Sequence, residues 1–132
     1  MELILNEATK AHVHHMLVFR CESNDSNWFQ TRLNNPHVCW TAQDNDSAPC
    51  YEVLWGWAHG VAPFVLPENI GFRMGPSAAA FRYIEIQMHY DNPDSISGMV
   101  DNSGLRMYYT PELRQYDAGV IIMGKVARFD LV

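Results

Sequence analysis

The chain has 132 residues, 48% of them hydrophobic, and a formal net charge of −6 at pH 7. A chain of this length forms one ordinary domain, and its apolar content argues against disorder. Basic residues are scattered and do not alternate with aromatic ones, which makes nucleic acid a poor candidate partner. Its apolar runs fall short of the ~20 residues that span a membrane, and MELILNEATK lacks the basic lead and apolar core of a signal peptide.

Short apolar runs between Pro, Gly, Asn and Asp clusters predict strands, because no segment keeps a helical period. In chain order these predicted strands cover residues 13–21, 51–58, 81–90, 104–110 and 119–132. Segment 22–50 is rich in Asn, Asp and Ser and predicts a long loop that Cys21, Cys39 and Cys50 could staple. The pattern predicts an all-β protein, an antiparallel β-sandwich made by a single domain over residues 1–132.

Three histidines open the first long predicted strand, in KAHVHHMLVFRC at 10–21. Imidazole is a good ligand for copper and zinc. On a regular strand His12 and His14 share a face and His15 points to the other. His14 and His15 can therefore reach one metal only at a strand end, an edge or a bulge. His89, which ends the alternating run FRYIEIQMHY just before a turn, is the best third ligand.

Other interpretations of the histidines stay open on the residues alone. The adjacent pair could be solvated or hydrogen-bonded without a metal, and His12-Val13-His14 could form a separate two-histidine site. The second alternative is disfavoured because His14 cannot easily serve two metals. His37 and His59 fall in loop-like segments without neighbouring ligands.

Five motifs follow one another in a fixed order, and together they resemble one family. They are HHMLVFRC at 14–21, LWGWAHG at 54–60, LPENIGFRMG at 66–75, IQMHYDNP at 86–93 and DNSGLRMYYT at 101–110. In this order they resemble the copper type II, ascorbate-dependent monooxygenases, and most of all the dopamine β-hydroxylase and DBH-like branch. The resemblance extends from about Ala11 to Gly124.

This resemblance implies the first copper domain of the family, a β-sandwich of jelly-roll type. His14, His15 and His89 would hold one copper, which ascorbate reduces and which passes electrons to a second copper. A substrate C–H bond is hydroxylated at that second copper. Gln87, on the same strand face as His89, is a candidate to support the ligands from outside the coordination sphere.

The resemblance also implies a pairing for the cysteines. Cys21 would form a disulfide with Cys50, whereas the family partner of Cys39 lies upstream of the histidine pair and has no counterpart here. Cys39 is therefore expected to be unpaired in this chain, unless the chain lacks its native N-terminus. The implied location is the secretory pathway lumen, a vesicle or the extracellular space, and the N-x-S triplets at Asn24 and Asn45 are expected glycosylation sites.

The second copper of the family needs a His-x-His pair and a methionine in a further domain, which is expected outside this chain. That domain would be the partner of this one and would set the choice of a small, amine-type substrate. The chain alone is thus expected to be incomplete for catalysis. A non-catalytic copper-binding or electron-carrier domain and a β-sandwich interaction module remain the alternatives.

Overall fold

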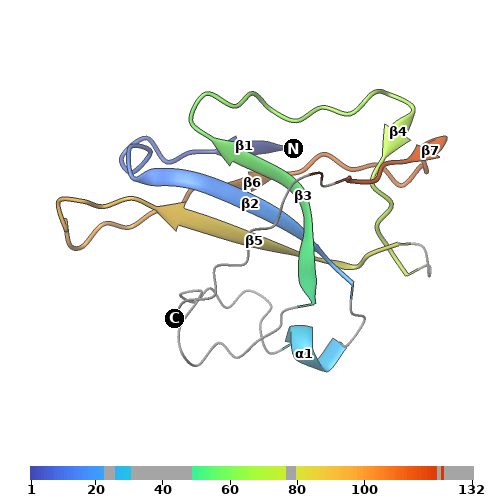
Figure 1. Ribbon diagram of the computed structural model, residues 1–132, viewed down its shortest axis with the longest axis horizontal. Helices are drawn as coiled ribbons and strands as arrows, with labels where there is room; N and C mark the ends of the chain where they lie inside the picture. The colour runs from blue at the N-terminus through green and yellow to red at the C-terminus, as the bar shows by residue number, and fades with distance from the viewer. Residues whose placement is uncertain (23–25, 31–48, 77–79, 122, 124–132) are drawn as a thin grey trace.

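The computed structural model describes residues 1–22, 26–30, 49–76, 80–121 and 123, and strands dominate it (Figure 1). The elements in chain order are β1 (Glu2–Ile4), β2 (Val13–Cys21), α1 (Ser26–Gln30), β3 (Cys50–Ala58), β4 (Ile70–Gly71), β5 (Tyr83–Tyr90), β6 (Gly104–Arg106) and β7 (Tyr116–Asp117).

The three long strands form one antiparallel sheet in the order β3-β2-β5, with β2 in the middle (Figure 1). Two small pairs accompany this sheet. β1 pairs with β6 in antiparallel fashion, and β4 pairs with β7 in parallel. β2 is paired with β5 from Val13 to Cys21 and with β3 from His15 to Cys21, so most of this strand is held on both sides.

The sequence predicted the long strands well. The runs at 13–21, 51–58 and 81–90 agree with β2, β3 and β5 to within two residues. The prediction for 104–110 was too long, because β6 ends at Arg106. Most of the predicted strand at 119–132 lies outside the described residues.

Four short elements were not predicted from the sequence. The strands β1, β4 and β7 have two or three residues each, too few to carry a period of two. Helix α1 has five residues and lies in the segment predicted as a loop. The parallel β4–β7 pair and the three separate sheets also differ from a wholly antiparallel sandwich. The described residues make an all-β arrangement of small sheets with one short helix.

The main core lies on one face of the central sheet. Met16 and Val18 of β2 are fully buried and pack with Leu54, Trp55 and Phe81. Leu54 and Trp55 are neighbours in sequence, yet both are buried. A register shift explains this, because Val18 pairs with Trp55 and Phe19 with Val53, which leaves Leu54 as an extra residue.

A second, smaller cluster surrounds the disulfide between Cys21 and Cys50, which join the ends of β2 and β3 as expected. Phe29 of α1 completes this cluster and stacks on Tyr83 of β5 with ring centroids 3.8 Å apart. An isolated helix of five residues is unstable in water, so this packing is what holds α1. Cys39 lies outside the described residues.

Replacing Trp55 by Ala should lower the free energy of unfolding by about 3–5 kcal/mol, because it removes a buried indole from the main core. Urea denaturation followed by tryptophan fluorescence and circular dichroism measures the change. Ile86→Ala is the matched control on the same sheet. Ile86 is 45% exposed, so its truncation should have a much smaller effect. Equal losses in the two variants would contradict this assignment of the core.

Replacing both Cys21 and Cys50 by Ser should lower the free energy of unfolding by about 3–4 kcal/mol, as expected for a disulfide that joins residues at a sequence separation of 29. Thermal unfolding of the oxidised wild type and the double variant gives the difference. Peptide mapping without reductant must also recover Cys21 linked to Cys50. A different linkage would contradict the pairing.

Candidate metal centre

A β-bulge at His14 brings the adjacent histidines to one face of the sheet. In the pairing of β2 with β5, Val13 lies opposite Tyr90 and His15 lies opposite His89, so His14 is an extra residue on β2. Val13 and Met16 are both fully buried on the core face, and the two residues between them are turned outward together. Of the three arrangements that the sequence allowed, the structure has the bulge.

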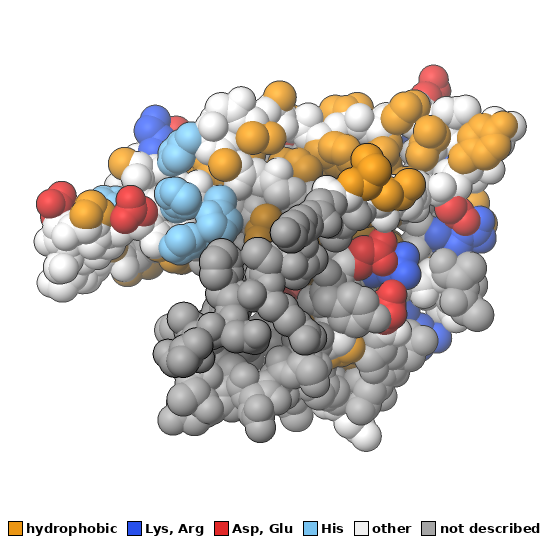
Figure 2. All heavy atoms as spheres, in the orientation of Figure 1, with side chains coloured by type: hydrophobic (Ala, Val, Ile, Leu, Met, Phe, Trp, Pro, Cys, Tyr) orange, Lys and Arg blue, Asp and Glu red, His pale blue; other side chains and the backbone are white. Residues whose placement is uncertain are grey.

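The three imidazoles converge within hydrogen-bonding range. Nδ1 of His15 lies 2.9 Å from Nδ1 of His14 and 3.3 Å from Nδ1 of His89. Among the described residues, these three form the one group of three or more potential ligands whose ligand atoms all lie within 4.8 Å of each other. Figure 2 shows histidine side chains in pale blue gathered on an exposed part of the surface.

The two distances from His15 fit pairs of nitrogens that share one metal ion. Two imidazole nitrogens about 2.0–2.1 Å from a shared ion lie roughly 2.9 Å apart at a right angle and roughly 3.4 Å apart at a tetrahedral angle. His14 and His89 are exposed and His15 is half-buried, so the ion would be open to solvent on one side. Such a site keeps a position for a further ligand.

The electrostatics also suit metal binding. Burial is the main cause that lowers the pKa of His15, and positive charge on His89 and His14 lowers it further. All three effects disfavour the imidazolium form. A metal needs the neutral imidazole, so the packing of the three rings keeps His15 in the form that binds.

Two further described histidines, His12 and His59, lie apart from this centre. His12 makes a contact of 3.1 Å from Nδ1 to the carbonyl oxygen of Asp91, and the ring of His59 packs edge-on against Trp57. The separate His12–His14 site therefore has no support in the geometry. His37 lies outside the described residues, as do Asn24 and Asn45.

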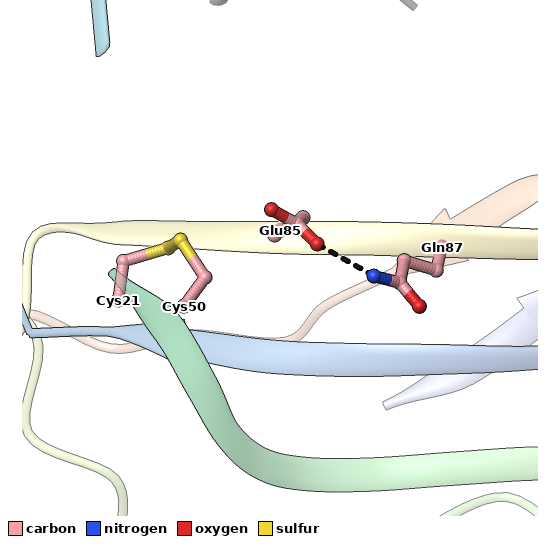
Figure 3. The surroundings of a disulfide bond; sticks show 4 residues. All are labelled: Cys21, Cys50, Glu85 and Gln87. Atoms are coloured by element: carbon pink, nitrogen blue, oxygen red, sulfur yellow. Dashed lines mark hydrogen bonds between the residues drawn. A yellow bond between two sulfur atoms is a disulfide. The ribbon is translucent and has the colours of Figure 1, made fainter. Parts of the chain in front are cut away.

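Gln87 lies on the histidine face of β5, opposite Leu17. Its side-chain amide donates a hydrogen bond of 2.9 Å to Oε1 of Glu85, and Figure 3 shows this pair along the strand. A role for Gln87 in supporting the metal ligands stays a prediction.

Sequence reasoning missed a carboxylate behind the centre. Asp101 accepts hydrogen bonds from Thr9, from Ser103 at 2.8 Å and from Tyr90 at 2.8 Å. Burial raises the pKa of Asp101, but these hydrogen bonds outweigh it and the net pKa is lowered. Burial and the bond to Asp101 raise the pKa of Tyr90 to about 12. The signal available in the sequence was a tyrosine directly after His89 and an acidic turn, DNSG, before β6.

Residues 1–97 match the sequence pattern described as the copper type II ascorbate-dependent monooxygenase, N-terminal domain. The chain belongs to this family. The three converging imidazoles are thus found in a family whose name specifies copper.

Relatives within this copper monooxygenase family are similar over most of the chain. DBH-like monooxygenase protein 1 of Gallus gallus is 42% identical over 113 residues, which is 85% of this chain and 18% of the relative. Dopamine beta-hydroxylase of Equus caballus is 38% identical over 130 residues, covering 95% of this chain and 20% of the relative. The chain thus spans about a fifth of the length of these relatives. Within the described residues, no helix has the length and apolar character to cross a membrane.

Asp101→Asn should make the free energy of unfolding depend less on pH in the acid range. The lowered pKa means that folding favours the charged carboxylate; this contribution is complete above the unfolded pKa, about 4, and is lost as the pH falls through the lower folded value. The stability difference between wild type and variant should therefore be largest near neutral pH and shrink in acid. Urea denaturation across this range measures it.

Glu68→Gln, which alters an exposed carboxylate, is the matched control and should leave the dependence of stability on pH unchanged in the acid range.

In the alkaline range, stability should fall as the pH rises. Because the pKa of Tyr90 is raised, its contribution should be lost as the pH rises from about 10 to about 12. A constant difference between wild type and Asp101→Asn across the acid range would contradict the hydrogen-bonded carboxylate.

Proposed function

We propose that this chain is the first copper domain of a copper- and ascorbate-dependent monooxygenase, and that His14, His15 and His89 hold its single copper. The observation that carries the proposal is the bulge at His14, which turns two adjacent histidines toward a third on the neighbouring strand. The bulge leaves both imidazoles on the exposed face beside His89, and this is the arrangement that a shared metal ion requires.

The proposed role is electron transfer, one electron at a time. When bound, copper supplies a redox centre that alternates between two oxidation states, and imidazole is a suitable ligand for it. The exposure of His14 and His89 supports direct access by a small reductant, for which ascorbate is the candidate that the family name provides. The half-buried His15 anchors the site to the central strand.

The finer features of the family belong to the same proposal. Residues 1–132 would form one domain and contribute to a jelly-roll β-sandwich, with a second copper domain in another part of the protein. The family description as an N-terminal domain and the coverage of a fifth of the relatives support this division. Hydroxylation of an amine-type substrate, as the name dopamine beta-hydroxylase suggests for that relative, would require both domains.

An oxidising compartment is the proposed location: the secretory lumen, a vesicle or the extracellular space. The Cys21–Cys50 disulfide supports it, because disulfides persist in such compartments and are rare in the cytosol. Glycosylation at Asn24 and Asn45 remains part of this proposal, and so does the unpaired state of Cys39.

Copper stoichiometry tests the central claim. Purified, oxidised chain should retain one copper after dialysis, measured by elemental analysis. Single replacements of His14, His15 and His89 by Ala should each abolish tight retention while leaving the circular dichroism spectrum unchanged, because the imidazoles lie outside the apolar core.

His59→Ala is the matched control, since His59 lies outside the centre and packs against Trp57. It should retain copper like the wild type. Loss of copper in this control, or retention in His89→Ala, would show that the three-histidine assignment is wrong. A folded wild-type chain without copper would overturn the proposed function of this domain.

A further inference from the structure

Asp101 connects the two histidine-bearing strands from the reverse face of the sheet. Tyr90 follows His89 on β5 and lies opposite Val13, so its side chain points away from the imidazoles. The Tyr90 hydroxyl donates to Oδ2 of Asp101 at 2.8 Å, and the Thr9 hydroxyl donates to Oδ1. One carboxylate thus accepts bonds from the end of β5 and from the turn that precedes β2.

The turn before β2 is itself tightly connected. The amide of His12 donates to the carbonyl oxygen of Thr9 at 2.8 Å, and Thr9 is only 5% exposed. The bond from Thr9 to Asp101 is partly buried, whereas the bond from Tyr90 to Asp101 is exposed. Ser103 extends the connection, since its hydroxyl donates to Asp101 and accepts the amide of Asn6 at 2.9 Å.

These hydrogen bonds support the end of the β2–β5 ladder that lies beyond the bulge, where the pairing is short. A bulge interrupts the ladder, and β2 begins at Val13, so only one strand pair, Val13 with Tyr90, lies beyond the interruption. One backbone bond, from the amide of Asp91 to the carbonyl oxygen of His12 at 2.7 Å, continues the pairing there. On its own, so short a stretch of ladder fixes the register weakly.

We propose that Asp101, together with Tyr90 and Thr9, is a positioning group for the three-histidine centre. It holds the short end of the ladder in register, so that His14 remains the extra residue and its ring stays beside His15 and His89. The consequence for copper rests on the proposed function. The claim about ring positions applies to the metal-free chain.

The test removes single hydroxyl groups. Tyr90→Phe and Thr9→Val each delete one bond to Asp101 with little change in shape. Tyr108→Phe is the matched control: the Tyr108 hydroxyl also donates to a carboxylate, Oε1 of Glu2 at 2.7 Å, but neither residue belongs to β2 or β5. Any general loss of stability from deleting a tyrosine–carboxylate bond appears in the control as well.

The first measurement uses metal-free protein. Nuclear Overhauser contacts among the three imidazole rings should be present in the wild type and in Tyr108→Phe. In Tyr90→Phe and Thr9→Val they should weaken or vanish, although the protein stays folded. Contacts that survive in both of these variants would overturn the positioning role of Asp101, whatever copper does.

The second measurement adds copper(II) alone. Tyr90→Phe and Thr9→Val should bind it about tenfold more weakly, the lower end of the range for groups that orient metal ligands, and should give mixed electron paramagnetic resonance signals. The control should keep one signal and the wild-type affinity. If Tyr90→Phe and Thr9→Val lose the ring contacts and the wild-type chain binds no copper, the positioning role is supported and only the proposed function is overturned.

Discussion

The pairing of β2 with β5 admits one more residue on β2 than on β5, between Val13 and His15. Side chains alternate strictly between the faces of a regular strand, so an extra residue reverses the alternation from that point on. Here the reversal lets Val13 and Met16 both enter the core, while two consecutive imidazoles stay outside it. Over four adjacent residues, the bulge therefore buries the first and the last and keeps the two histidines between them out of the core.

The rest of β2 builds on this register. Its core face carries Met16 and Val18, and its other face carries His15 and, at the far end, Cys21 with the disulfide. β5 pairs with β2 from Val13 to Cys21 and β3 pairs with it from His15 to Cys21, so β2 is held on both sides from His15 onward. His15 therefore has a rigid support, whereas His14 lies where β2 is paired on one side only.

Sequence patterns predicted the elements that are long enough to show a period. The runs that became β2, β3 and β5 have eight or nine residues, and the alternation of FRYIEIQMHY placed His89 on the correct face. The same patterns could not locate the bulge, since a bulge depends on which partner residue lies opposite. Nor could they find Asp101, whose role comes from hydrogen bonds across more than 90 positions of sequence to Thr9. The two-residue strands β4 and β7 exist only because tertiary structure brings them together.

Because of the bulge, one change can remove the histidine cluster and leave the fold intact. Deletion of the single residue His14 would leave Val13 opposite Tyr90 and His15 opposite His89 in an unbroken, regular ladder. The apolar core and the disulfide would keep their partners, while the cluster would fall from three imidazoles to two. The loss of one codon would thus remove the proposed metal centre and leave the β-fold in place. Descendants of that kind would be recognised by a sequence one residue shorter between the buried Val13 and Met16.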